Sequence, residues 1–76
     1  MAKTRTMHDR LVEGLVAIGA TPDPTKVSKR HTVLQEPMRP GRWYFVGKAG
    51  GLRVGTSATN SISLPGMRDD LLRRTP

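Results

Sequence analysis

The chain has 76 residues, enough for one small domain and too few for a second hydrophobic core. It has no cysteine, which excludes disulfide bonds and thiolate metal sites, and its 13 Lys and Arg residues against 6 Asp and Glu residues give a net charge of +7. No apolar segment approaches the roughly 20 residues of a membrane-spanning helix, and no secretory signal follows the basic N-terminus. We therefore expect a cytoplasmic protein without a membrane partner.

The N-terminal part of the chain predicts a helix. Residues 1–5 are expected to be disordered, and a helix is expected at about 6–18, where Thr6 and Asp9 form a weak capping box. Gly19 fits the position just after the helix end. Apolar residues recur at helical spacing, namely Met7, Leu11, Leu15 and Ile18. This apolar stripe is expected to face the core.

A basic segment, Lys26-Val27-Ser28-Lys29-Arg30-His31, comes before the first predicted strand. It is either an arm that grips phosphates or a solvent-exposed loop, and both interpretations stay open. The strand is predicted at about 31–36, where β-branched and aliphatic residues precede Pro37.

The next two strands are predicted at about 42–48 and 52–57, joined by a glycine-rich turn. A two-residue loop, either Gly50-Gly51 or Ala49-Gly50, is favoured because it buries two large aromatic residues. One face would then hold the core residues Trp43, Phe45, Leu52 and Val54, and the other Arg42, Tyr44, Val46, Lys48 and Arg53. A three-residue loop, Ala49-Gly50-Gly51, would instead place Tyr44 and Val46 with Leu52 and Val54, and Trp43 and Phe45 on the other face.

A short second helix is predicted at about 65–74. Pro65 suits the first turn of a helix, while Arg73 and Arg74 complement the dipole at its end. The predicted fold class is therefore α+β: one small domain, 1–76, in the order α-β-β-β-α, with a three-stranded antiparallel sheet packed against helices.

No motif in the chain indicates catalysis. The run Gly47-Lys48-Ala49-Gly50-Gly51 lacks the Gly-Lys-Ser/Thr ending of a phosphate loop and lies between two strands. Asp69 and Asp70 are adjacent, so on a helix they point about 100° apart and form no carboxylate dyad. We expect no enzyme, no cofactor, no metal site and no catalytic residue.

The distribution of charge gives the functional hypothesis. Residues 26–53 hold seven cationic side chains and one carboxylate, Glu36. A clustered basic patch is typical of proteins that bind polyanions, although surplus Lys and Arg also serve solubility. On the predicted basic face, an aromatic side chain would stack on an unpaired base while cations contact phosphates. The candidate nucleic-acid-binding residues are Lys26, Lys29, Arg30, Arg42, Tyr44, Lys48 and Arg53.

The hairpin also carries a resemblance. The string Trp43-Tyr44-Phe45-Val46-Gly47-Lys48-Ala49-Gly50-Gly51-Leu52-Arg53-Val54-Gly55, followed by Ser61-Ile62-Ser63-Leu64, resembles small uncharacterised proteins encoded by tailed bacteriophages and prophages. The resemblance implies a phage origin, and a location in the host bacterial cytoplasm, but no assigned activity. The element order is also similar to that of integrase arm-binding and AP2 DNA-binding domains, which is an analogy of fold alone.

Three alternative functions are therefore considered, in order of preference. The first is binding of nucleic acid, DNA or RNA, through the basic sheet face. The second is interaction with an acidic host protein that the chain would modulate. The third is a minor virion or assembly component that forms homo-oligomers through its strand edges.

Overall fold

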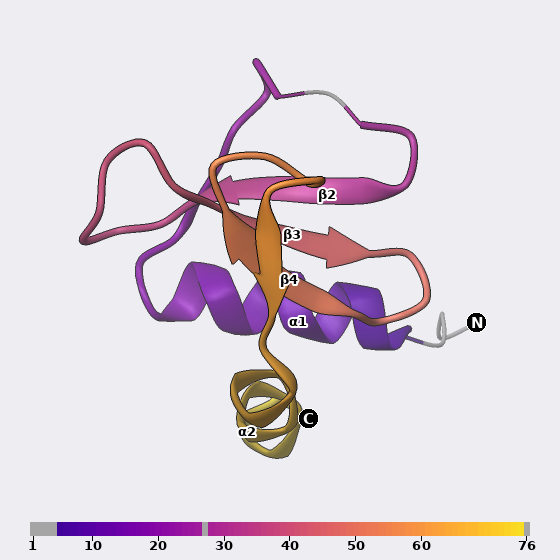
Figure 1. Ribbon diagram of the computed structural model, residues 1–76. Coiled ribbons are helices and arrows are strands. Elements are labelled where there is room, and N and C mark those ends of the chain that lie inside the picture. Colours follow the sequence, from indigo (N-terminus) through magenta and orange to yellow (C-terminus); the bar gives the residue numbers. More distant parts are fainter. Residues whose placement is uncertain (1–4, 27, 76) are drawn as a thin grey trace.

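The computed structural model describes residues 5–26 and 28–75, in which a five-stranded antiparallel sheet carries two helices on one face (Figure 1). The strands follow one another across the sheet in chain order. The elements are α1 (Met7–Ala17), β1 (Thr21–Pro22), β2 (His31–Gln35), β3 (Trp43–Gly47), β4 (Leu52–Gly55), β5 (Ser61–Ser63) and α2 (Pro65–Arg74). No helix in this described part is long and apolar enough to cross a membrane.

The α+β class, the two helices and the antiparallel sheet are confirmed, but the prediction of three strands is wrong. Two short strands, β1 and β5, form the edges of the sheet. β1 has two residues, one of them Pro22, and β5 is Ser-Ile-Ser, so neither has the run of β-branched and aromatic residues that predicts a strand. Most of the segment expected to be disordered, 1–5, lies outside the described residues.

Helix α1 begins at a complete capping box. The Asp9 N–H donates to Thr6 Oγ1 over 3.1 Å, and the Thr6 N–H donates to the Asp9 carboxylate over 3.4 Å. The hydrogen bond between His8 and the Asp9 carboxylate, followed by those with Thr6, lowers the pKa of Asp9. Leu11 and Leu15 are fully buried against the sheet.

The turn between β3 and β4 has three residues, so the prediction of a two-residue loop is wrong. The Gly50 N–H donates to Gly47 O, and the Gly47 N–H donates to Gly51 O. Gly50 has a φ of 96°, the left-handed conformation that completes a three-residue hairpin loop. The loop is therefore Lys48-Ala49-Gly50, one residue earlier than the three-residue alternative considered from the sequence.

This turn fixes which side chains share a face. Tyr44 pairs with Val54 and Val46 pairs with Leu52, and all four lie on the face beneath the helices, called here the helix-covered face. Trp43 and Phe45 lie on the opposite, outer face, which reverses the predicted assignment. The main core consists of Leu11, Leu15, Ala20, Leu34, Tyr44, Val46, Leu52, Val54 and Leu71.

Loops cover the outer face where helices do not. Val33 and Phe45 are each only 5 % exposed. A small cavity of about 190 Å³ shows what lies over them, because its lining includes residues of the β1–β2 loop and the β4–β5 loop: Lys26, Ser28, Val33, Phe45, Thr56, Ser57 and Ala58. Both faces of the sheet are therefore occupied, one by helices and one by loops.

Candidate nucleic-acid interface

The seven residues proposed from the sequence do not form one surface. Tyr44, expected to be an exposed aromatic between cations, is 7 % exposed and lies in the main core. Burial raises the pKa of its hydroxyl above the usual 10.0. The predicted face that joined Tyr44 to Arg53 is wrong, because β4 pairs Arg53 with Phe45 and so places it on the outer face.

Arg53 is bound within the sheet. Its Nε donates to Ser61 Oγ and a terminal nitrogen donates to Ser61 O, both over 2.8 Å. Arg53 pairs with Ser63, so its side chain extends diagonally to Ser61. Gly55, the pairing partner of Ser61, has no side chain that would block this contact. The guanidinium group of Arg53 therefore ties β4 to the edge strand β5 through two hydrogen bonds to neutral groups, which fix its position.

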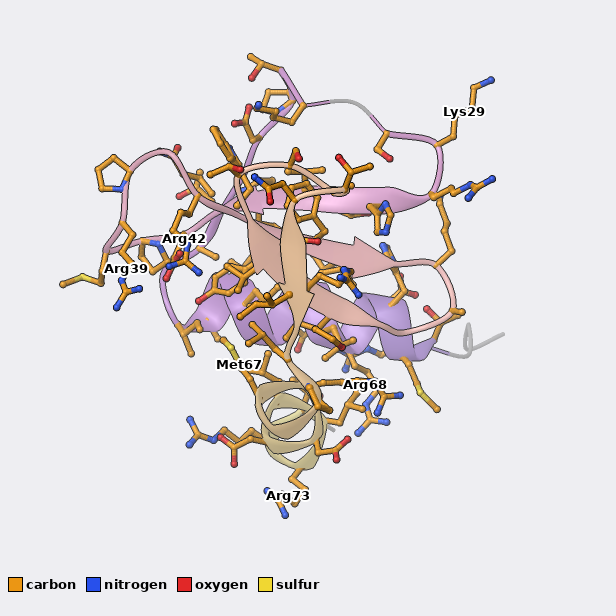
Figure 2. All side chains as sticks on the ribbon, in the orientation of Figure 1. Lys29, Arg39, Arg42, Met67, Arg68 and Arg73 are labelled. Carbon is orange, nitrogen blue, oxygen red and sulfur yellow. The ribbon has the colours of Figure 1, made fainter. Side chains whose placement is uncertain are left out.

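Arg42 lies at the other end of the sheet from the β3–β4 turn. Its Nε is 3.5 Å from the Glu36 carboxylate in the β2–β3 loop. Arg39 belongs to the same loop, is exposed and has no side-chain partner among the described residues. Figure 2 shows Arg39 and Arg42 on the side of the molecule away from Lys29. Glu36, the one carboxylate of residues 26–53, thus pairs with a cation at this end of the sheet and not with those near the β3–β4 turn.

Lys26 covers the outer-face aromatic residue. Its Nζ lies 4.0 Å from the centre of the Trp43 ring, a cation–π contact. The Trp43 Nε1–H donates to the Asp23 carboxylate over 2.8 Å, and Thr25 also donates to that carboxylate. The hydrogen bonds from Thr25, followed by that from Trp43, lower the pKa of Asp23. These contacts hold the β1–β2 loop against the sheet.

Lys29, Arg30 and Lys48 remain, and they lie together. The Lys48 N–H donates to Arg30 O over 3.3 Å, and the next pair along the strands is His31 with Gly47. All three side chains are exposed, and none has a hydrogen bond or ion pair with another described residue. We call these three residues the basic end. Lys29 points away from the body of the molecule (Figure 2).

The start of α1 and one side chain of α2 border the basic end. Met7 lies against Gly50, where a Cβ atom would come within 2.9 Å of the Met7 Cβ. Arg68 Nε donates to Gly50 O over 2.5 Å, and another nitrogen of Arg68 lies 2.9 Å from the Asp69 carboxylate. The turn that carries Lys48 is therefore held by both helices.

No carboxylate of the described residues pairs with a cation of the basic end. Each of the 6 Asp and Glu residues of the chain is described, and each has a partner of its own. The pairs are Asp9 with Thr6 and His8, Glu13 with Arg5, Asp23 with Trp43 and Thr25, Glu36 with Arg42, Asp69 with Arg68, and Asp70 with Arg73 and Arg74. Among the described residues, the basic end groups three exposed cations that have no carboxylate partner.

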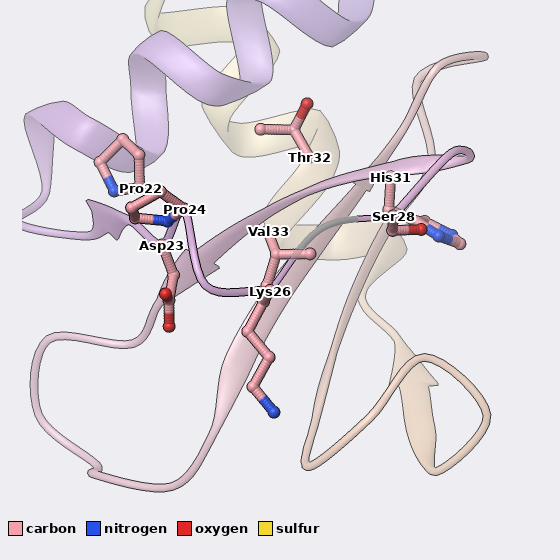
Figure 3. Close-up of a pocket in the computed structure, with 8 residues that line it drawn as sticks. All are labelled: Pro22, Asp23, Pro24, Lys26, Ser28, His31, Thr32 and Val33. Carbon is pink, nitrogen blue, oxygen red and sulfur yellow. The ribbon is translucent and has the colours of Figure 1, made fainter.

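An open groove of about 550 Å³ runs beside β2 under the β1–β2 loop (Figure 3). His31 stands in its wall, with its ring at 6.1 Å from that of Phe45 in an edge-to-face arrangement. The His31 Nδ1 atom is buried and has no hydrogen-bond partner among the described residues. The groove is lined by Pro22, Asp23, Pro24, Lys26, Ser28, His31, Thr32 and Val33.

Comparisons with protein-family models, with curated proteins and with solved structures gave no match. The resemblance to phage-encoded proteins therefore stays a prediction. Within residues 5–26 and 28–75, no three His, Asp or Glu side chains gather as a metal site would require.

Sequence reasoning missed the contacts that hold the side chains of Trp43 and Arg53. Asp23 and Ser61 looked like ordinary loop residues, yet they receive the side chains of Trp43 and Arg53. Both partners lie across the sheet, 20 and 8 residues away along the chain. The one available signal was the aspartate between two prolines, which is typical of a turn in which the Asp side chain accepts a hydrogen bond from the backbone two residues later, as Asp23 does from the Thr25 N–H.

Proposed function

We propose that the protein binds nucleic acid, DNA or RNA, through the basic end. The observation that carries this proposal is the grouping of three exposed cations on two adjacent backbone segments, none of which forms an ion pair with another described residue. Uncompensated positive charge on a rigid support attracts phosphates and releases the counterions condensed on them.

The contacts that we propose differ from those expected from the sequence. Lys29, Arg30 and Lys48 are kept as phosphate-binding residues. Arg42 and Arg53 already have partners in Glu36 and Ser61, and Lys26 lies over the Trp43 ring, so these three residues are not kept as main contacts. Tyr44 is removed because it is buried.

The test is a titration of fluorescently labelled, mixed-sequence oligonucleotides, followed by anisotropy at low salt. The decisive variant is Lys29→Gln/Arg30→Gln. Its matched control is Arg73→Gln/Arg74→Gln, which removes the same two charges from the exposed end of α2, where both arginines pair with Asp70. The two variants have equal net charge, so a general electrostatic attraction would weaken both alike.

We expect the basic-end variant to lose about tenfold or more in affinity at low salt and the control to lose less than about threefold, since non-specific binding is dominated by local phosphate contacts. Equal losses would contradict a localised site. An absence of binding to any nucleic acid would reject the proposal and direct attention to an acidic protein partner, which would recognise the same cations.

Self-association through strand edges has weaker support. The two edges, β1 and β5, have only two and three residues. On β5 the Ser61 carbonyl is already bound by Arg53. An edge so short offers few backbone groups to a second copy.

A further inference from the structure

The three aromatic residues of the chain are not available for base stacking. Tyr44 and Phe45 are 7 % and 5 % exposed. Trp43 is half-buried, carries the Lys26 ammonium above its ring at 4.0 Å and is bound through its ring nitrogen to Asp23. Platforms for single strands rely on aromatic side chains that accept a base. Trp43, Tyr44 and Phe45 therefore form no such platform.

The strands cannot read base edges either. A sheet that enters a groove presents its outward side chains to the bases. Here the central outward residues, Val33 and Phe45, are buried beneath residues of two loops, and Arg53 is bound to Ser61. No outward side chain in the middle of the sheet is therefore free to recognise a sequence.

Among the described residues, the exposed and unpaired cations that lie together are those of the basic end, on turns at one end of the sheet, whereas Arg39 lies alone at the other end. Long side chains on the turns reach phosphates without the sheet itself approaching the bases. A double helix presents one phosphate charge per about 1.7 Å of its axis, compared with one per about 3.4 Å for a single strand. Three cations within one small area thus meet more phosphate oxygens on a duplex.

We propose that the ligand of the basic end is a double helix, held by its phosphates and without sequence readout. This inference rests on the proposed function and restricts its ligand from nucleic acid in general to a double helix. It excludes stacking on the aromatic residues as the source of affinity.

The test compares a short labelled duplex with each of its separated strands, over salt concentrations from about 50 to about 200 mM. Trp43 emission is recorded in parallel with unlabelled ligands. With three phosphate contacts the slope of log K against log salt is expected near −2.7 for the duplex, which is about a 40-fold loss over this range. For Lys29→Gln/Arg30→Gln the slope is expected to fall to about −0.9, and for Arg73→Gln/Arg74→Gln to stay near −2.7.

The supporting result is tighter binding of the duplex than of either strand, equal affinity for two duplexes of unrelated sequence, and unchanged Trp43 emission at saturation. Tighter binding of a single strand with saturable quenching of Trp43 would overturn this inference and leave the proposed function standing. A strong preference for one duplex sequence would also overturn it. If neither ligand binds, the proposed function and this inference both fail.

Discussion

On the helix-covered face, Leu34, Tyr44 and Val46 lie beneath two helices in a continuous aliphatic and aromatic core, whereas on the outer face Val33 and Phe45 lie beneath two loops. The first arrangement relies on buried apolar surface. The second adds specific polar contacts, such as the one between Asp23 and Trp43. A sheet with helices on one side only can thus be closed on its other side by anchored loops.

This difference also bears on where a ligand can bind. The helix-covered face is filled, and the middle of the outer face is capped. The β1–β2 loop that caps the outer face also carries Lys29 and Arg30 to the end of the sheet, beside the turn that carries Lys48. The first part of the β1–β2 loop therefore packs against the outer face, and its last part carries the exposed cations Lys29 and Arg30.

The largest effect is expected from the helix-covered face. Leu15→Ala should lower the free energy of unfolding by about 2–5 kcal/mol, because Leu15 is fully buried and the truncation leaves a cavity. Val33→Ala, on the outer face, should lower the free energy of unfolding by about 1.5 kcal/mol, because it removes two buried carbon atoms. Urea unfolding followed by circular dichroism measures both. A larger loss for Val33→Ala would mean that the loop-covered cluster is the main core.

A second effect concerns Gly55 in β4, which the backbone at the end of the β4–β5 loop approaches closely. A Cβ atom on Gly55 would lie 2.6 Å from Ser61 Cα, next to the Asn60 carbonyl oxygen. Gly55→Ala should therefore cost about 1–3 kcal/mol, the range for overpacking. Gly51→Ala is the matched control in the same hairpin, since a Cβ atom there meets nothing within 4 Å. Equal unfolding midpoints for the two variants would show that the loop does not pack against β4.

A smaller effect is expected from the loop anchor. Asp23→Ala removes the acceptor for the Trp43 Nε1–H, so Trp43 should become more accessible to acrylamide quenching while the unfolding midpoint moves less than in Leu15→Ala. Asp23→Asn, which keeps an acceptor oxygen, is the control. If acrylamide quenches Trp43 equally in all three proteins, the β1–β2 loop is not held by this contact.

The smallest effect is a dependence on pH. The pKa of Asp23 is lowered from the usual 3.8 by its hydrogen bonds with Thr25 and Trp43. The stabilisation by the carboxylate is therefore fully present above pH 3.8 and is lost as the pH falls through the lower folded-state pKa. Trp43 emission should change below pH 3.8, and the change should be absent in Asp23→Ala. A transition centred above pH 5 would assign it to a different group.

Much of the fold was predictable because the signals are local. The capping box at Thr6 and the proline at position 65 mark the starts of the two helices. The orientation of the hairpin was not predictable by the same means. It depends on one residue of loop length, and the left-handed conformation of Gly50 decides it. A change of one residue exchanges the two faces of a strand.

The candidate site was predictable only as a region of positive charge. The sequence places seven cations between Lys26 and Arg53 but does not show that Arg42 and Arg53 are engaged by Glu36 and Ser61. Those contacts join residues across the sheet, so they depend on register. Lys29 and Arg30 are adjacent in sequence, but their closeness to Lys48 appears only when β2 pairs with β3.

The most direct test is a titration of isotopically labelled protein with a short duplex, followed by amide chemical shifts in two-dimensional NMR spectra. We expect the shifts to concentrate at residues 28–31 and 47–51, with the amides of Arg39, Arg42, Arg73 and Arg74 unchanged. Shifts centred on the β2–β3 loop or on α2, or no shifts at any ligand concentration, would contradict the assignment of nucleic-acid binding to the basic end.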